Sequence, residues 1–201
     1  MEIVGNIIDM SISADNGGFT LLELIVAMVI SMFVMAAIYT LFRSSSELFV
    51  SQEQIVGVRQ DIRATLSMIA HDIRMAGLDP ARSASDAGIA SANATSLHIL
   101  YDEDGDGACD TDLDYLYVSA EDALKVQTGG GGGYQPLVYD ISSVGFTYVL
   151  SDGSTTSTPT DSSMIRMVGI QLCGKIDGPY SEKYDSLQCF NSTVRCRNMG
   201  L

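Results

Sequence analysis

Residues 19–42 read FTLLELIVAMVISMFVMAAIYTLF, and Glu23 is the only charged side chain among them. About 20 apolar residues in a helix cross the ~30 Å hydrocarbon core of a bilayer, so this run predicts a single transmembrane helix. A carboxylate inside such a span costs roughly 2.5–3.5 kcal/mol at the middle of the bilayer, and such residues are usually kept for a function. Glu23 is therefore the first candidate site residue.

Residues 43–77 continue this run as an amphipathic helix. Their apolar side chains recur at spacings of three, four or seven residues, which places them along one side of a helix. The charged residues occupy the other positions, and the pattern assigns Asp72 to the solvent side with them. Gly77, followed by Pro80, predicts the end of the helix.

After Pro80 the sequence takes on the character of strands. Short runs rich in β-branched and aromatic residues alternate with Gly, Asp and Ser clusters, and Asp152-Gly153 marks a turn. A helix followed by strands predicts an α+β fold, in which a long N-terminal helix packs on an antiparallel β-sheet. The predicted strands are residues 97–101, 113–118, 124–127, 137–140, 144–150 and 165–172, with exposed loops at 128–133 and 151–163.

The charge excludes some classes of function. The chain has a formal net charge of −14, whereas nucleic-acid binding needs a basic face to neutralise phosphates, so a nucleic-acid-binding protein is not predicted.

The sequence contains neither a G-x-S-x-G motif nor a phosphate-binding loop, so an enzyme is not predicted. His71 is expected on the helix surface, and His98 is expected as an ordinary strand residue.

Residues 18–23, GFTLLE, resemble the cleavage and methylation motif of type IV prepilins. The resemblance implies that a prepilin peptidase cuts between Gly18 and Phe19 and methylates the new amino group of Phe19. Glu23 would then be the fifth residue of the mature chain. Buried charges persist when they are paired, so Glu23 would neutralise the amine of a neighbouring subunit during assembly.

This resemblance implies four segments in the chain, a location in the cell and binding partners. Residues 1–18 would be the leader, 19–42 the membrane and assembly helix, 43–77 its amphipathic continuation, and 78–201 a globular β-rich domain. The chain would sit in the inner membrane as a single-pass protein with a periplasmic domain before it enters a filament with other pilins. The leader departs from the family because it has no Lys or Arg, so orientation is inferred from the cleavage motif.

A second resemblance narrows the family. Residues 58–80, VRQDIRATLSMIAHDIRMAGLDP, are similar to the end of the N-terminal helix in PilW-type minor pilins. The resemblance implies a minor pilin that helps to initiate assembly of a type IV pilus. The J-type pseudopilins of type II secretion have a related helix and remain an alternative. A membrane-anchored, calcium-dependent adhesion module is a further alternative, from another functional class.

Four cysteines follow the membrane segment, and an even number in an exported domain predicts two disulfides with three possible pairings. The spacing of Cys189 and Cys196 resembles the terminal disulfide loop of many pilins. That resemblance implies a Cys189–Cys196 bond and, for the remaining pair, Cys109–Cys173. A zinc site is disfavoured because the sequence has no CxxC pair.

An acidic segment at residues 102–114 is the one candidate metal site. Asp102, Asp104 and Asp106 match the first, third and fifth positions of an EF-hand loop, and Asp110 suits the ninth position. Leu113 stands where the bidentate glutamate belongs, and strands rather than helices flank the segment. The sequence therefore predicts a calcium-binding loop in a hairpin, completed by Asp112 or Asp114, with a solvated acidic turn as the alternative.

Overall fold

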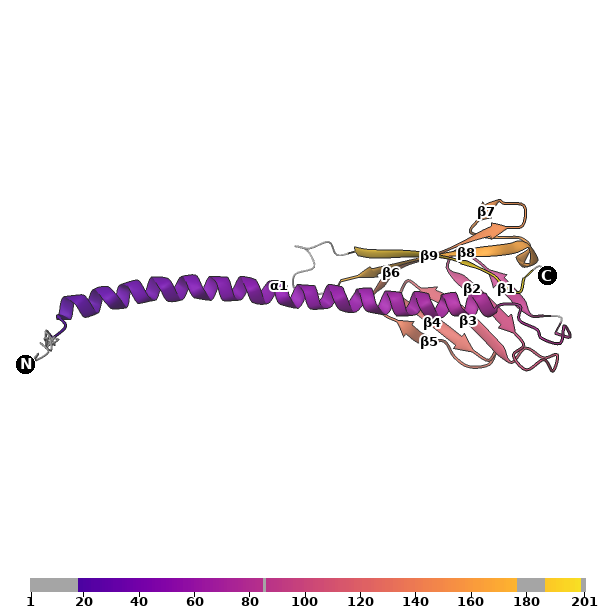
Figure 1. The fold of residues 1–201 in the computed structure, drawn as a ribbon, viewed down its shortest axis with the longest axis horizontal. Helices are drawn as coiled ribbons and strands as arrows, with labels where there is room; N and C mark the ends of the chain where they lie inside the picture. Colours follow the sequence, from indigo (N-terminus) through magenta and orange to yellow (C-terminus); the bar gives the residue numbers. More distant parts are fainter. Residues whose placement is uncertain (1–17, 85, 177–186, 200–201) are drawn as a thin grey trace, which may run out of the picture. The chain divides into compact units, whose positions relative to one another are not determined.

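The computed structural model describes residues 18–84, 86–176 and 187–199. It divides into two compact units, Met1–Ser46 and Glu47–Leu201. Helix α1 (Leu21–Met75) is continuous through both units (Figure 1). The expected long helix is confirmed, and its described ends lie within two residues of the predicted ones.

Helix α1 ends at a glycine turn and is closed by two hydrogen bonds from a residue far along the chain. Gly77 adopts a left-handed backbone with φ of 76°, which glycine reaches without a steric penalty and which stops the helix. The side-chain amide of Asn198 donates to the carbonyl oxygens of Arg74 and Met75, at 3.2 and 3.4 Å. Asn198 thus satisfies carbonyl groups that a helix end leaves without partners.

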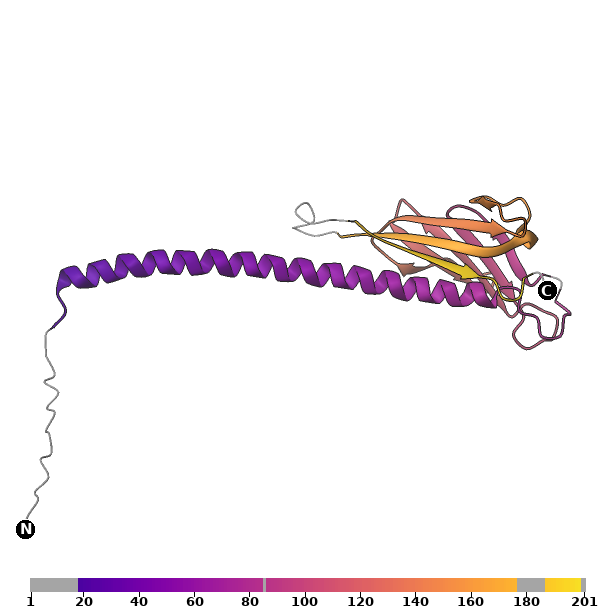
Figure 2. The same cartoon turned by 45° about the horizontal axis from the view of Figure 1, so that its top comes forward.

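The strands form two antiparallel sheets, which Figures 1 and 2 show on either side of the domain. The first sheet has the order β1-β2-β3-β4-β5, and the second has the order β7-β6-β8-β9. The first contains β1 (Gly88–Ala92), β2 (Ser96–Tyr101), β3 (Thr111–Val118), β4 (Ala123–Thr128) and β5 (Gln135–Val138). The second contains β6 (Ile141–Leu150), β7 (Thr155–Thr156), β8 (Ile165–Lys175) and β9 (Leu187–Arg195), with a short 3-10 helix, η1 (Ser162–Met164), before β8.

One hydrophobic core joins the C-terminal part of α1 to both sheets. Ile62, Ile69 and Ile73 of the helix are completely buried, as the one-sided apolar pattern predicts. The first sheet contributes Leu97, Ile99 and Tyr115 among others, and the second contributes Phe146, Ile170 and Leu172. The two sheets are also joined directly, because the Tyr148 hydroxyl donates to the Asn93 carbonyl oxygen at 2.8 Å.

The α+β fold with a helix on antiparallel sheets is therefore confirmed, and all six predicted strands overlap observed ones. Asp152-Gly153 forms a turn between β6 and β7, with φ of 84° at Gly153. Strands β1, β7 and β9 were not predicted. Strand β9 is the most consequential of these, because it carries Cys189 at a position that the sequence assigned to a loop.

Candidate functional site

The first candidate site is the start of helix α1. Gly18, Phe19 and Thr20 have no regular secondary structure, and all three are exposed. The Thr20 hydroxyl accepts a hydrogen bond from the backbone N–H of Glu23 at 3.2 Å, and the Thr20 carbonyl oxygen accepts one from Leu24 at the same distance. Thr20 is therefore the N-cap of the helix, and Glu23 is the third residue after it.

Thr20 and Glu23 form the sequence pattern of a capping box, a further helix-start signal in this stretch. In this pattern a Ser or Thr is followed three residues later by Glu or Gln, and it marks a helix start. An acid in the first helical turn also interacts favourably with the helix dipole. Glu23 therefore has a local structural role in addition to the assembly role that the resemblance implies.

Gly18 is not required by the local structure. A Cβ atom added at Gly18 would have no atom within 4 Å, and the backbone there is not in a left-handed conformation. A requirement for a small residue at this position would have to come from another molecule. A peptidase whose active site admits only a small side chain would impose this requirement.

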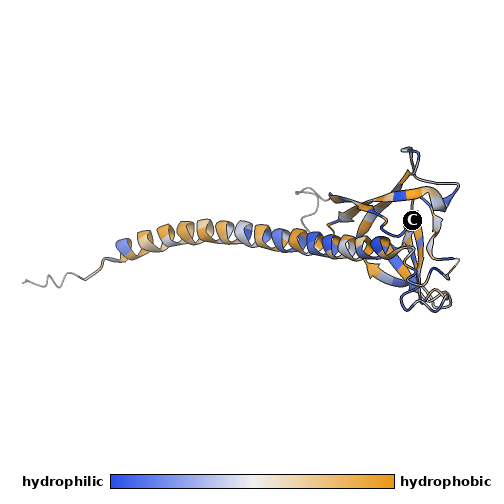
Figure 3. Cartoon of the chain, turned by 45° about the vertical axis from the view of Figure 1, so that its right-hand side comes forward, coloured by the Kyte–Doolittle hydropathy of each residue, from blue (hydrophilic) through white to orange (hydrophobic). Residues whose placement is uncertain are grey.

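Every residue of α1 in the first unit is exposed, and most of these residues are apolar (Figure 3). One 18-residue window of the helix has a mean hydropathy of 2.6, and none of it is buried within the chain. Soluble monomers rarely expose apolar patches of this extent, so lipid or other helices must cover the surface. By length and composition the helix can cross a membrane.

The acidic segment forms a compact loop. One carboxylate oxygen from each of Asp102, Asp104 and Asp106 lies within 4.8 Å of the other two. Asp102 is completely buried, and its two oxygens accept hydrogen bonds from the N–H groups of Gly105 and Gly107, at 2.6 and 3.0 Å. Asp102 therefore closes the loop through backbone amides, while Asp104 and Asp106 are more accessible.

Asp110 lies in the same loop and also bonds to its backbone. One of its oxygens accepts from the N–H groups of Glu103 and Asp104, at 3.0 and 3.3 Å. In the neighbouring loop, one carboxylate oxygen of Asp79 is buried without a hydrogen-bond partner among the described residues. Calcium binding by Asp102, Asp104, Asp106 and Asp110 stays a prediction, because amide hydrogen bonds alone also account for the shape of the loop.

The disulfide pairing is a correction. The structure joins Cys173 to Cys189, with 4.0 Å between their Cα atoms, and leaves Cys109 and Cys196 as free thiols. Cys173 and Cys189 are directly opposite each other in the β8–β9 ladder. Because a strand rises about 3.3 Å per residue, Cys196 lies roughly 20 Å from Cys189, far beyond the range of a disulfide. The predicted Cys189–Cys196 and Cys109–Cys173 bonds are therefore wrong.

The two free thiols lie in different surroundings. Cys196 belongs to the hydrophobic core, and burial raises the pKa of its thiol to about 11. Cys109 is half-buried beside the acidic loop, where burial and then the nearby carboxylate of Asp86 raise the pKa of its thiol. Raised pKa values reduce the thiolate fraction, so both thiols are poorly reactive at neutral pH.

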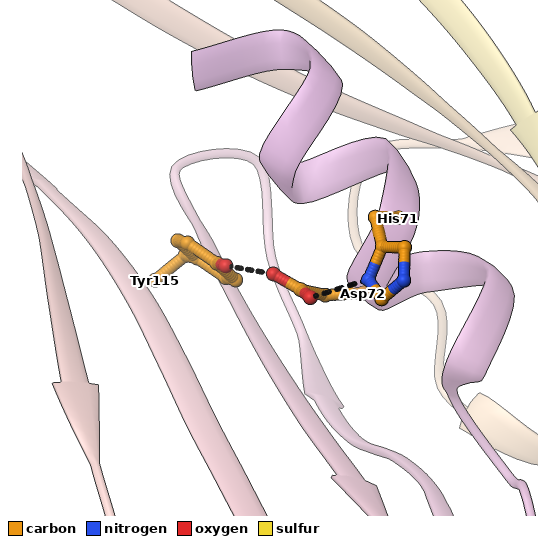
Figure 4. Close-up of polar contacts among 3 residues, drawn as sticks. All are labelled: His71, Asp72 and Tyr115. Atoms are coloured by element: carbon orange, nitrogen blue, oxygen red, sulfur yellow. Dashed lines mark hydrogen bonds and ion pairs between the residues drawn. The ribbon is translucent and has the colours of Figure 1, made fainter. Parts of the chain in front are cut away.

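Asp72 is a second correction, because it is buried rather than on the solvent side of the helix. Figure 4 shows its carboxylate between Tyr115 and His71. The Tyr115 hydroxyl donates to one oxygen, and Nδ1 of His71 lies 3.3 Å from the other. Burial, and then the hydrogen bond to Asp72, raise the pKa of Tyr115 well above its usual range. This contact fixes α1 against β3.

The two histidines are placed as expected. The side chain of His71 is mostly exposed on α1, and His98 lies in β2. Nε2 of His98 lies 2.7 Å from a carboxylate oxygen of Asp112 on the adjacent strand β3. Asp112 was expected to complete the calcium site if Asp114 does not, so its contact with His98 is one that the sequence did not indicate.

Comparison with known proteins identifies the N-terminal segment. Residues 13–39 match a family model described as "Prokaryotic N-terminal methylation motif". The match covers the candidate cleavage site and the first part of the apolar helix, and it supports a prepilin-like chain of the type IV pilin and pseudopilin kind. The motif and the apolar helix together indicate processing by prepilin peptidase and anchoring in a membrane. Comparison with curated proteins finds no match.

Proposed function

We propose that the chain is a PilW-type minor pilin, which helps to initiate assembly of a type IV pilus after the peptidase cuts between Gly18 and Phe19. The observation that supports this most is the methylation motif at the start of an apolar helix whose side chains are not buried within the chain. Proteins of this kind are structural components, so the proposed role is assembly and not catalysis.

In this proposal the working group at the N-terminus is a pair of charges. Cleavage creates an amino group on Phe19, and Glu23 lies about one helical turn further along the chain. Both groups would be costly within the apolar layer if unpaired. Pairing the Glu23 carboxylate with the amine of an adjacent subunit removes this cost and sets the axial position of one helix against the next.

Helix α1 then connects this assembly segment to the sheet domain. Its second part carries buried isoleucines and the Asp72–Tyr115 hydrogen bond, which hold the domain on the helix. The domain would lie in the periplasm before assembly and in the filament afterwards. A J-type pseudopilin would use the same motif and helix in a secretion machine, so the two roles differ in the partners and not in this chemistry.

The experiment is a complementation assay in a strain from which the gene is deleted. The full chain, a Glu23→Gln variant and a Glu53→Gln control are expressed at equal levels, and surface pili and type II secretion are measured separately. Glu53 is exposed on the same helix but lies beyond the apolar run. Restoration of pili by the full chain and the control, but not by Glu23→Gln, supports the proposal. If the deletion strain and all complemented strains are piliated normally, and the full chain restores only secretion, the pseudopilin role is identified instead.

A further inference from the structure

Strand β9 is an edge strand whose outward backbone groups have no partner among the described residues. Cys173 and Cys189 are opposite each other with their Cα atoms 4.0 Å apart. This short separation identifies a pair that exchanges no hydrogen bonds across the ladder, since pairs that do are about 5.5 Å apart. The N–H and C=O groups of Cys189 therefore point away from β8, toward the open edge.

Along an antiparallel strand, the backbone groups of successive residues point alternately toward and away from the neighbouring strand. The direction at Cys189 therefore determines the direction at each other residue of β9. The backbone N–H and C=O groups of Asn191 and Thr193 therefore face the open edge, like those of Cys189. The N–H of Cys196 faces β8 instead and donates to the carbonyl oxygen of Arg166 at 3.0 Å. On β8, Lys175 is opposite Leu187, two positions from the Cys173–Cys189 pair, so its N–H should also point away from β9. It does so, because it donates to the carbonyl oxygen of Asp140 at 2.7 Å. No hydrogen bond between described residues uses the edge-facing backbone groups of Asn191 or Thr193.

The other three edge strands each carry a feature that disfavours an added strand. Strand β1 has an irregularity between Ile89 and Ser91, β5 is four residues long and contains Pro136, and β7 has two residues. Bulges, proline and short length are the devices that proteins use to prevent pairing at an edge. Strand β9 has nine residues in unbroken register with β8 and no proline, and Figure 2 shows it at the end of its sheet.

The charges beside β9 indicate what kind of strand it accepts. Neither β8 nor β9 contains an Asp or Glu, although the chain carries a formal net charge of −14. Arg59 donates to the Gln188 side chain, and Arg63 lies over the Phe190 ring, 5.2 Å from its centroid. Arg195 is exposed at the end of the strand. None of the ion pairs between described residues includes any of these three arginines.

We propose that the open edge of β9 binds an extended, carboxylate-bearing strand of another protein, which adds to the second sheet beside β9. Backbone hydrogen bonds to Asn191 and Thr193 would hold the strand, and its carboxylates on the side that faces α1 would pair with Arg59 and Arg63. The Cys173–Cys189 bond keeps β9 in place before binding. A second copy of β9 is a poorer occupant, because it has no carboxylate and its only charged side chain is Arg195.

The test uses the full chain in detergent and a nine-residue peptide that alternates valine with glutamate, matched to the length of β9. Asn191→Pro removes an edge-facing N–H that the fold does not use, and Asn191→Ala removes the side chain but keeps that N–H. We expect the peptide to slow hydrogen exchange in β9. Its affinity should fall at least about tenfold in Asn191→Pro and change less than about threefold in Asn191→Ala.

A peptide-side control keeps the test valid if Asn191→Pro folds poorly. N-methylation of the alternate peptide amides that face β9 should abolish binding, whereas methylation of the remaining amides should not. Three results would overturn the proposal: no saturable binding, equal affinity of the proline and alanine variants, or equal affinity for a valine–lysine peptide at low salt. Self-association of the chain that Asn191→Pro abolishes would also overturn it, because the occupant would then be a second copy.

Discussion

The Tyr115 hydroxyl of strand β3 donates a hydrogen bond to the buried carboxylate of Asp72 on helix α1. A carboxylate in a protein interior is costly unless its lone pairs have donors. The pair therefore favours one position of the helix on the first sheet, because sliding the helix by one turn would leave Asp72 without this donor. Both residues belong to the second unit, so the contact holds the C-terminal part of α1 on the first sheet.

The first prediction concerns this pair. Tyr115→Phe removes the donor and leaves the buried carboxylate with only His71, so the free energy of unfolding should fall by about 1–3 kcal/mol. Denaturant unfolding of the full chain in detergent measures the change. Tyr139→Phe is the control, because Tyr139 is 60% exposed and should change stability by less than about 0.5 kcal/mol. Equal effects of the two substitutions would show that the hydrogen bond contributes nothing.

The second prediction tests the packing of α1 on the second sheet. A Cβ atom added at Gly174 would lie 2.6 Å from Val58 Cγ1 and 2.7 Å from Ile62 Cδ1. Gly174→Ala should therefore overpack the contact and destabilise the domain by about 1–3 kcal/mol. At Gly145 the nearest atom would be 3.7 Å away, so Gly145→Ala should have little effect. The melting temperatures of the two variants and the original chain are compared. A Gly174→Ala protein that melts at the same temperature as the original chain would contradict the close contact between α1 and β8.

The third prediction concerns the cysteines. Digestion without reduction should yield a peptide pair linked through Cys173 and Cys189, with Cys109 and Cys196 as thiols. Cys196 should be alkylated slowly at pH 8 because its pKa is raised to about 11. Replacing both linked cysteines by serine should lower stability by about 3 kcal/mol, since the bond closes a loop of 16 residues. Recovery of a Cys189–Cys196 peptide would restore the pairing that the sequence implied.

The fourth prediction concerns calcium. If the acidic loop binds the ion, millimolar calcium on a site of ~0.1 mM affinity would stabilise the chain by only about 1.4 kcal/mol. The measurement is a thermal melt with calcium or chelator, repeated with the double variant Asp104→Asn/Asp106→Asn. These two residues are the appropriate choice because Asp102 is buried and its oxygens already accept backbone amides. If calcium shifts the melting temperature of the original chain and of the double variant equally, the loop is not a calcium site. It is then an acidic turn closed by hydrogen bonds.

Much of the fold could be predicted because its elements have strong local signals. The apolar run, the one-sided stripe through Ile62, Ile69 and Ile73, and the Gly77–Pro80 stop define the helix without tertiary information. The predicted strands are those with dense β-branched and aromatic residues. Strand β1 was missed because four of the five residues in GIASA are small, which gives a weak strand signal.

The other errors have identifiable causes. Strand β9 was missed because polar residues interrupt the apolar ones in LQCFNSTVR, and because the resemblance implied a Cys189–Cys196 loop there. Asp72 was assigned to the surface because it is charged, although it lies three residues after Ile69 and four before Ala76, both of them buried. Its helical position was therefore a usable signal. Its partner Tyr115 is 43 residues away, and only the folded chain brings the two together.

The central claim is that the chain is cut between Gly18 and Phe19 and then assembled through its apolar helix. The most direct measurement is the mass of the N-terminal peptide of the protein isolated from membranes and from sheared filaments. The account predicts a mature chain that begins with N-methyl-Phe19, and accumulation of the uncut chain when Gly18 is replaced by a bulky residue. Filament-incorporated protein that still begins at Met1 would contradict it.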